Sequence, residues 1–268
     1  MTYTNNRNFA NTYNRCSGIL AHITSLPSPY GIGDMGSGTY DFLRFLQKSK
    51  QSILQILPLG PTDPAFSNSP YMTISAFAGN PLIISPELLF ESGLLTDAEI
   101  TNLQEFSPYT VHFDNVTQLK DKLLTAAFSR FKTKKDEQFT HFVKDTEWLA
   151  DYCLFRALKQ HYSGSPWYSW DSDIAKREPQ ALAKANELLK NEIAYYQFEQ
   201  FVFTQQWRKL QDFAMECGIK IFGDIPIYIS LDSADVWANQ SIFELDENTS
   251  LPTHVAGVPP DYFLYLFL

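Results

Sequence analysis

The chain has 268 residues, of which 44% are hydrophobic and 19% are charged. This composition excludes an intrinsically disordered protein and a collagen-like fibre. The 21 Lys and Arg residues are outnumbered by 30 Asp and Glu residues, which gives a formal net charge of −9. Because a chain this acidic repels phosphate groups, we expect it to bind neither nucleic acid nor an anionic membrane surface.

The N-terminal residues and the cysteines bear on the compartment. Residues 1–10 are polar and contain no apolar h-region, so no secretory signal is expected. No segment has the length and apolar character of a membrane span. The cysteines are Cys16, Cys153 and Cys217, and they lack a CxxC pairing, which speaks against a disulfide framework and a zinc site. These features predict a cytoplasmic protein.

The first elements follow a strand–helix–strand pattern. Residues 17–24 form a short apolar run that predicts a buried strand. Residues 40–49 carry apolar side chains at helical spacing, and residues 52–57 predict a second strand. This order indicates a parallel α/β arrangement. Residues 63–80 then form a long loop rich in Ser, Pro and aromatic residues, and loops of this length inside a domain are usually functional.

The middle of the chain is mainly helical in pattern. Residues 81–85 are predicted to form a third short strand, and residues 86–91 a helical turn. The sequence TDAE at 96–99 is a capping box, which predicts the start of another helix. Helical patterns continue over residues 116–159 and, after a Trp-rich break, over residues 178–217.

A strong strand signal follows this helical region. Gly218 is predicted to end the preceding helix, and residues 219–229 (IKIFGDIPIYI) then predict a strand that is apolar on both faces. Asp224 interrupts this strand near its expected C-terminal end, where parallel α/β proteins place their active sites. It is either a functional carboxylate or a partner of a cation or loop. Asp232 and Asp235 are expected to cap the next helix, with Asp232 or Ser233 as its N-cap.

Residues 31–36 spell GIGDMG, a formal match to the GxGxxG dinucleotide fingerprint. The preceding loop contains Pro27 and Pro29, whereas the fingerprint requires a tight turn. Asp34 would place a negative charge among amides that should bind phosphate. We therefore interpret the motif as an ordinary glycine-rich loop and expect no dinucleotide cofactor.

Aromatic residues make up 15% of the chain. Most are expected in the core, but Tyr71 lies in the loop SNSPYMTIS, and Tyr262 and Phe263 lie in AGVPPDYF. Rings held in proline-bearing loops can stack on the C–H faces of sugar rings. None of the five histidines supports a triad or a metal site, and His22 is predicted to be a satisfied core or pocket-edge residue. Nucleophilic serine chemistry and metal catalysis are not expected.

Several long stretches together resemble the amylomaltase (4-α-glucanotransferase) family. They are SGILAHITSLPSPYGIGDMG, QILPLGPTDPAFSNSPYMTISAFAGNPLI, WLADYCLFRALK, GDIPIYISLDSADVWAN and VAGVPPDYF. The resemblance implies an α/β fold that is a partial (β/α)₈ TIM barrel, with its first three or four strands and a long, mainly helical insertion. Residues 1–84 would begin the barrel, residues 85–216 form the insertion, and residues 217–268 add a further strand and a lid loop.

The activity that the resemblance implies is the transfer of α-1,4-glucan segments between maltooligosaccharides or to glucose, by a retaining mechanism and without a metal or organic cofactor. Starch- and glycogen-derived glucans would also be substrates. The residues assigned to substrate binding are Ser69, Tyr71, Asp224, Asp261, Tyr262 and Phe263. Ser69 and Tyr71 would line the donor sugar site, Asp224 would support it, and the last three would belong to a lid. Met72 departs from the family pattern, which usually has Gln there.

The family's catalytic carboxylates are expected on later strands, so the resemblance assigns no catalytic residue in this chain. The apolar ending LYLFL is interpreted as the product of a frameshift or a truncated reading frame. We therefore expect the chain to lack transferase activity alone, and a separately encoded C-terminal half would complete it. The alternative is a non-catalytic glucan-binding fragment that keeps the aromatic platforms.

Overall fold

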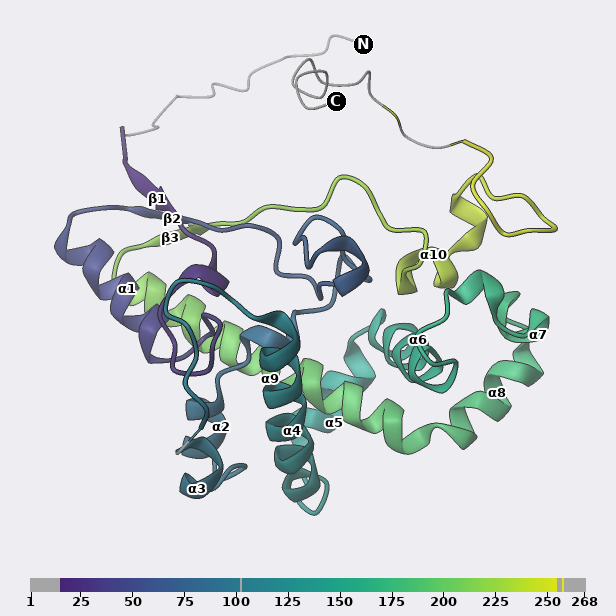
Figure 1. The fold of residues 1–268 in the computed structure, drawn as a ribbon, viewed down its shortest axis with the longest axis horizontal. Coiled ribbons are helices and arrows are strands. Elements are labelled where there is room, and N and C mark those ends of the chain that lie inside the picture. Colours follow the sequence, from purple (N-terminus) through teal and green to yellow (C-terminus); the bar gives the residue numbers. More distant parts are fainter. Residues whose placement is uncertain (1–14, 102, 255–256, 258–268) are drawn as a thin grey trace, which may run out of the picture.

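A computed structural model of the protein describes residues 15–101, 103–254 and 257. Strands β1 (Gly18–Leu20), β2 (Ile53–Gln55) and β3 (Lys220–Phe222) form one parallel sheet in the order β1-β2-β3. The register pairs Ile19 with Leu54 and Leu54 with Ile221. The predicted parallel α/β arrangement is therefore confirmed, and Figure 1 shows the sheet at one end of an otherwise helical molecule.

Helices make up most of the remaining structure. The α-helices are α1 (Ser37–Lys48), α2 (Pro86–Glu91), α3 (Asp97–Ile100), α4 (Phe113–Phe131), α5 (Glu137–Asp145), α6 (Leu149–His161), α7 (Ser172–Ala175), α8 (Pro179–Leu188), α9 (Lys190–Glu216) and α10 (Ala234–Ala238). Short 3₁₀ helices are η1 (Ile23–Ser25), η2 (Pro64–Phe66), η3 (Pro81–Ile83), η4 (Trp167–Ser169) and η5 (Gln240–Ile242).

Several local predictions are confirmed. The capping box of α3 is formed. The Thr96 side chain accepts a hydrogen bond from the Glu99 backbone amide, and the Glu99 side chain accepts one from the Thr96 backbone amide. Gly218 follows α9 with φ +72°, a left-handed conformation that favours glycine. Both features depend on neighbouring residues only, which is why the sequence pattern predicts them.

Three predicted strands differ from the structure. The buried strand predicted over residues 17–24 is limited to β1, at Gly18–Leu20, where Gly18 and Leu20 are exposed, because Ile23–Ser25 form the 3₁₀ helix η1. Residues 81–85 do not form a strand, because Pro81 starts the 3₁₀ helix η3 and the Asn80 side chain accepts a hydrogen bond from the Leu82 amide. The strand predicted over residues 219–229 is limited to β3, at Lys220–Phe222. Pro226 lacks the amide hydrogen that a longer ladder would need.

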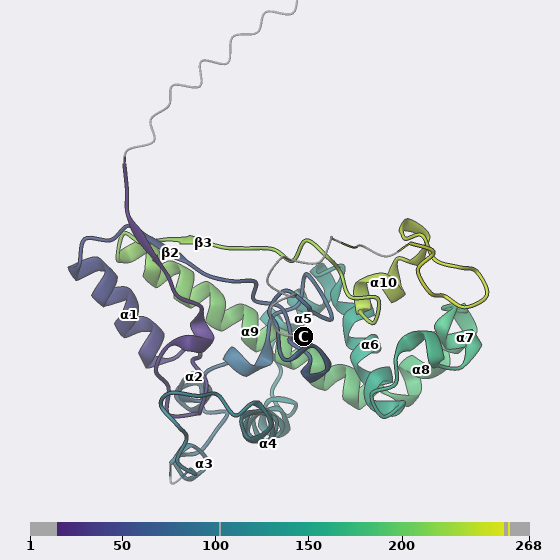
Figure 2. The same ribbon diagram turned by 45° about the horizontal axis from the view of Figure 1, so that its top comes forward.

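One hydrophobic core lies between the sheet and the helices. Its buried residues come from β2, α1, α4 and α9, among others, and include Leu54, Leu43, Leu123, Phe198 and Leu210. The two views show α1 and α9 beside the sheet, with the long α9 continuing from there to the opposite end of the molecule (Figures 1 and 2). These helices cover one face of the sheet.

A second core surrounds α6 and α10 at the other end of α9. Trp167 and Trp237 are fully buried there. The Trp237 indole nitrogen donates a hydrogen bond to the Ile174 carbonyl oxygen at 3.1 Å, and that of Trp167 donates to the Leu231 carbonyl oxygen at 2.6 Å. Both indole N–H groups are thus paired inside the core, as burial of a polar group requires.

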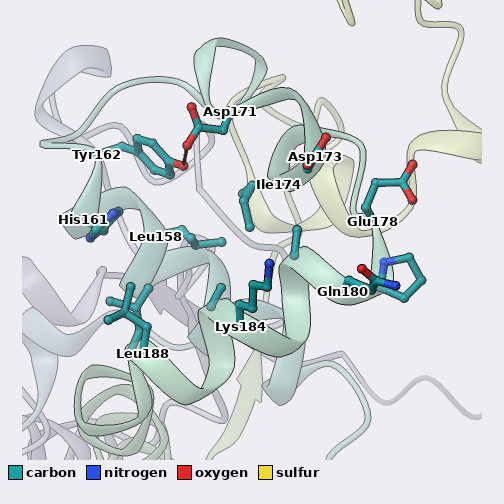
Figure 3. A pocket seen from close by; sticks show the side chains of 14 residues that line it. Leu158, His161, Tyr162, Asp171, Asp173, Ile174, Glu178, Gln180, Lys184 and Leu188 are labelled. Atoms are coloured by element: carbon teal, nitrogen blue, oxygen red, sulfur yellow. Dashed lines mark hydrogen bonds between the residues drawn. The ribbon is translucent and has the colours of Figure 1, made fainter.

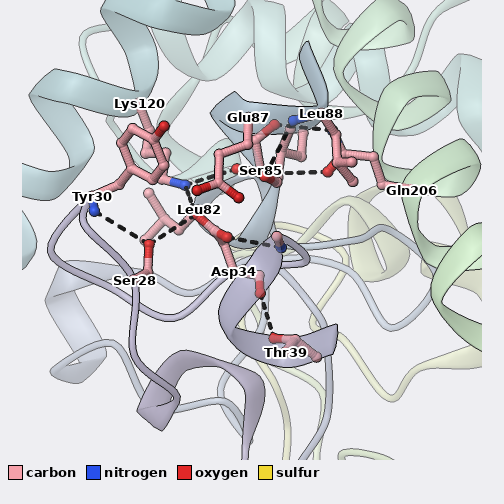
Figure 4. A network of polar contacts seen from close by, with 12 residues as sticks. Ser28, Tyr30, Asp34, Thr39, Leu82, Ser85, Glu87, Leu88, Lys120 and Gln206 are labelled. Carbon is pink, nitrogen blue, oxygen red and sulfur yellow. Dashed lines mark hydrogen bonds and ion pairs between the residues drawn. The ribbon is translucent and has the colours of Figure 1, made fainter. Parts of the chain in front are cut away.

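The GIGDMG loop is held by a buried ion pair. The Asp34 carboxylate accepts a hydrogen bond from Lys120 Nζ at 2.9 Å, and the two side chains are 4% and 1% exposed. Its other oxygen accepts from the Gly36 amide, and Lys120 also donates to the Ile84 carbonyl oxygen. Figure 4 shows Lys120 of α4 meeting Asp34 of the loop. The Asp34 carboxylate thus accepts a hydrogen bond from a backbone amide of the loop itself. This supports the interpretation of the motif as a structural loop.

Candidate functional site

The candidate site lies at the carboxyl edge of the sheet, where β2 continues into the long loop of residues 60–80. Thr62 and Thr73 form an antiparallel bridge that closes this loop, and the Thr73 hydroxyl donates to the Pro61 carbonyl oxygen at 2.8 Å. Gly60 is required there, because a Cβ atom would lie 2.4 Å from the Thr73 hydroxyl oxygen. The closed loop presents Tyr71 at the surface.

Tyr71 and Asp224 meet although 153 positions separate them in the chain. The Tyr71 hydroxyl donates a hydrogen bond to Asp224 Oδ2 at 2.9 Å. This bond raises the pKa of Tyr71, because the carboxylate accepts the phenolic proton and the negative charge opposes ionisation. The Tyr71 side chain is 43% exposed, so its ring stays accessible to a ligand. The remaining carboxylate oxygen, Oδ1, accepts from the Ile225 amide at 2.8 Å.

The other predicted site residues differ in where they lie. Ser69 lies beside Tyr71, and its hydroxyl oxygen accepts a long hydrogen bond of 3.4 Å from the Tyr71 amide. Asp224 lies just after β3 and is exposed, not within a strand as expected. Its charge therefore stays solvated, and the cost of burying a carboxylate does not apply to it. The three predicted lid residues, Asp261, Tyr262 and Phe263, lie outside the described residues.

Asp235 has a role that the sequence pattern did not reveal. Its Oδ1 accepts from the Ser75 hydroxyl at 3.0 Å, and its Oδ2 accepts from the Ala76 amide at 2.7 Å. Burial raises the pKa of Asp235, and these two hydrogen bonds lower it in part. Asp235 thereby fastens α10 to the loop that carries Tyr71. The residues it bonds lie 159 and 160 positions away, so no local signal could have indicated this contact.

The expected capping roles of Asp232 and Asp235 are wrong. The N-cap of α10 is Ser233, the second of the predicted candidates, whose hydroxyl oxygen accepts from the Val236 amide at 3.2 Å. Asp232 instead accepts from Lys159 Nζ at 2.7 Å and from the Trp167 amide at 3.2 Å. It therefore ties the chain before α10 to α6 and η4.

His22 follows β1 at the same carboxyl edge. Burial lowers the pKa of His22 to about 4, so the imidazole is neutral at physiological pH. Its Nδ1 atom is buried and has no hydrogen-bond partner among the residues that the structure describes. The prediction of a satisfied histidine is thus wrong for this nitrogen.

Two of the cavities among the described residues help to place the site, and both lie outside the Tyr71–Asp224 contact. The larger, of about 810 Å³, lies between α6, α7 and α8, and none of the predicted site residues lines it. Figure 3 shows Tyr162 donating to Asp171 at its rim. A cavity of about 500 Å³ is lined by Met72, the neighbour of Tyr71, together with Tyr228 and Ile229. The second cavity therefore adjoins the loop of the candidate site.

Neither metal coordination nor a membrane-crossing helix appears in the described part of the chain. Within residues 15–101, 103–254 and 257, no three His, Cys, Asp or Glu side chains are grouped closely enough to hold a metal ion. Among the same residues, none of the helices combines the length and the apolar character that crossing a bilayer requires.

The fold and the site define an α/β protein with polar residues at the carboxyl ends of parallel strands. Residues 21–265 match the model of the 4-alpha-glucanotransferase family. Because this match covers more than half of the chain, the chain belongs to the 4-alpha-glucanotransferase family.

Individual relatives agree with the family match. The chain is 46% identical to a 4-alpha-glucanotransferase of Synechocystis sp. over 93% of its own length, and 44% identical to that of Aquifex aeolicus, also over 93%. It covers 50% of each of these relatives, so it spans about half the length of the curated relatives it matches. The structure of amylomaltase from Streptococcus agalactiae in complex with acarbose superposes with a TM-score of 0.88 at 36% identity, covering 93% of this chain and 51% of that one.

Proposed function

We propose that this chain forms the donor-sugar side of a 4-α-glucanotransferase active site, within the first part of a (β/α)₈ barrel. The observation that carries the proposal is the hydrogen bond between Tyr71 and Asp224. It joins the loop after β2 to the segment after β3 at one edge of the sheet, where barrel enzymes place their substrates. Both residues lie in stretches that resemble the family, and the relatives' activity supports the assignment.

The chemistry that we propose for the site follows from its residues. The exposed ring of Tyr71 offers a stacking surface to the apolar face of a glucose unit, and Asp224 supplies a carboxylate that accepts hydrogen bonds from sugar hydroxyls. Ser69 holds the backbone of Tyr71. The donors would be maltooligosaccharides or glucans derived from starch or glycogen, and the acceptors would be maltooligosaccharides or glucose.

The reaction that we propose is a retaining double displacement. A carboxylate nucleophile forms a glycosyl-enzyme, and a second carboxyl group acts first as acid and then as base. These groups would come from a polypeptide segment equivalent to the unmatched half of the relatives. Asp261, Tyr262 and Phe263 would form a lid that excludes water and favours transfer over hydrolysis.

The test is maltotriose disproportionation with the full chain alone and with the chain co-expressed with the unmatched half of the Synechocystis relative. We expect no glucose release from the chain alone and transfer by the pair. Tyr71→Ala and Asp224→Asn should each lower the transfer rate of the pair at least about 10-fold, which corresponds to about 1.4 kcal/mol. Tyr109→Ala is the matched control, because Tyr109 is 95% exposed and lies outside the site. Transfer by the chain alone, or equal rates for all variants, would contradict the proposal.

A second candidate function is glucan binding without catalysis, and the accessibility of the Tyr71 ring favours it. In that case the isolated chain should bind maltoheptaose saturably, and Tyr71→Ala should abolish the binding. Isothermal titration calorimetry measures this directly. Glucan transfer by the co-expressed pair would favour the transferase function over binding without catalysis.

The proposed compartment is the cytoplasm. Cys16, Cys153 and Cys217 are all free thiols, and Cys16 is exposed. Free, widely spaced thiols suit a reducing compartment better than an oxidising one.

A further inference from the structure

The cavity between α6, α7 and α8 has the size of a ligand pocket and no role in the donor-sugar site. Its volume is about 810 Å³, and it lies at the end of the molecule opposite the sheet (Figure 1). Pockets that hold small molecules fall in this size range. Its floor is apolar and is formed by the buried side chains of Leu158, Ile174, Ala185 and Leu189.

Tyr162 gives this cavity an aromatic wall. Its ring stacks on the ring of Trp170, with centroids 5.4 Å apart and planes at 14° to each other. The Tyr162 hydroxyl donates a hydrogen bond to Asp171 Oδ2 at 2.7 Å (Figure 3). Trp170 is held in turn, because its indole nitrogen donates to the Ser165 carbonyl oxygen at 2.9 Å. The Tyr162 ring is therefore oriented before a ligand binds, which lowers the entropic cost of binding.

The pair of Tyr162 and Asp171 repeats the chemistry of the proposed donor-sugar site. There the Tyr71 hydroxyl donates to Asp224 Oδ2 at 2.9 Å. In both places a tyrosine ring and a carboxylate lie side by side at an accessible surface. Such a pair offers an apolar ring face for stacking and carboxylate oxygens that accept hydrogen bonds from hydroxyl groups.

Polar side chains surround the apolar floor. Asp173, Glu178, Gln180 and Lys184 line the cavity, and all four are exposed (Figure 3). Within the described residues, none of these four side chains is engaged in a hydrogen bond or an ion pair. The rim therefore has both donors and acceptors free for a ligand.

The charges of the lining favour a neutral ligand. The carboxylates of Asp171, Asp173 and Glu178 repel a phosphate or another anion, and the Lys184 ammonium repels a cation. A molecule with apolar faces and many hydroxyl groups matches both the floor and the rim. A chain of glucose units has this character.

We infer that this cavity is a second carbohydrate site, which holds an outer chain of a branched α-1,4-glucan while another chain of the same polymer occupies the Tyr71–Asp224 site. The inference rests on the proposed function, which supplies the glucan. An open cavity binds one short chain weakly. Two sites on one polymer raise the apparent affinity, because the second binding step is then intramolecular. Maltoheptaose presents a single short chain and gains no such advantage.

The experiment compares two probes on the full chain, glycogen by affinity electrophoresis and maltoheptaose by isothermal titration calorimetry. Tyr162→Ala removes the ring, and Ala181→Trp fills the cavity that the half-buried Ala181 lines. Each should weaken glycogen binding at least about 10-fold, because the avidity is lost, and leave the affinity for maltoheptaose unchanged. Ala183→Trp is the matched control, because Ala183 is exposed on the same helix and does not line the cavity.

The variant Ala181→Trp separates binding from folding, because it leaves the stack of Tyr162 on Trp170 intact. Equal glycogen affinities for Ala181→Trp and Ala183→Trp would overturn the inference, and so would a chain that does not bind glycogen. Loss of maltoheptaose binding in Ala181→Trp would overturn it as well, because the cavity would then act on short chains. If Tyr71→Ala binds maltoheptaose as the parent does, while Ala181→Trp still weakens glycogen binding alone, only the donor-sugar assignment fails.

Discussion

The two ends of the molecule bury their large aromatic residues to very different extents. Trp237, in the helical end around α6 and α10, is fully buried, whereas Phe222, in the sheet, is 60% exposed. The Trp237 ring lies 5.8 Å from that of Trp170 and 6.0 Å from that of Phe155, and the Arg177 guanidinium lies 4.3 Å from its centre. The helical end thus surrounds its aromatic side chains, while among the residues that the structure describes helices cover one face of the sheet only.

The two ends of the molecule therefore depend on different contacts for their stability. The helical end derives its stability from contacts within the described residues. The sheet packs against α1 and α9 through Ile19, Leu54 and Ile221, whereas Leu20 and Phe222, on its other face, are mostly exposed. Substitutions of similar chemistry should therefore have opposite consequences at the two ends.

The largest effect is expected at Trp237. Trp237→Ala should lower the free energy of unfolding by about 4 kcal/mol, because it empties a filled site in the second core. Phe222→Ala should change it by less than about 0.5 kcal/mol, because its ring is mostly in water already. Urea denaturation followed by fluorescence and circular dichroism measures both. Similar losses for the two variants would remove the contrast between the ends.

A smaller loss is expected from Lys120, which lies on α4 and pairs with Asp34 of the GIGDMG loop. Lys120→Met should cost about 3 kcal/mol, because it leaves Asp34 buried without its cation. Burial raises the pKa of Asp34, and Lys120 is the main group that opposes this rise. The native state of the variant therefore binds a proton more tightly than the unfolded chain does. Its deficit should grow as the pH rises through the raised pKa of Asp34, and shrink in acid.

Two further variants test whether the pH dependence comes from the ionisation of Asp34. Lys122→Met is the control, since Lys122 is exposed on the same helix and should show no such pH dependence. Adding Asp34→Asn to Lys120→Met should remove the pH-dependent part of the deficit, because Asn cannot ionise. Denaturation curves from acidic to neutral pH would show this, and a deficit independent of pH would contradict the assignment.

A loss of stability smaller than that at Lys120 is expected at the connection between the two ends. Asp235→Ala should cost about 2 kcal/mol, because Ser75 and Ala76 lose their buried acceptors. Amide exchange in the Tyr71 loop should also become faster, since α10 no longer holds it. Asp212→Ala, at an exposed position of α9, is the control. Unchanged exchange in the loop would mean that Asp235 does not position it.

Sequence reasoning succeeded where neighbouring residues decide the structure. The helix predicted over residues 40–49 corresponds to α1, and the capping box at Thr96 and the turn at Gly218 form as expected. It failed for residues 81–85, where a proline and an asparagine cap outweigh an apolar run. It also extended β3 too far, because apolar composition does not show where a strand loses its neighbour.

The candidate site was predictable only in part. Tyr71 and Asp224 could be named from their loop and strand context, and the resemblance to a family connected them. Asp235 was missed as an anchor of the Tyr71 loop, because its role depends on a contact between segments about 160 residues apart. The buried Nδ1 of His22 was missed for the same reason, since burial is a property of the folded chain.

The sequence by itself determined the parallel α/β class, the family and the local caps, since periodicity, turn residues and long matching stretches act within short segments. Only the tertiary structure decided which carboxylates are solvated, which are buried, and which meet Tyr71. It also decided that one face of the sheet is packed and the other bare. A sequence of apolar strands shows that both faces must be covered, but only the packed chain shows which face its own helices reach.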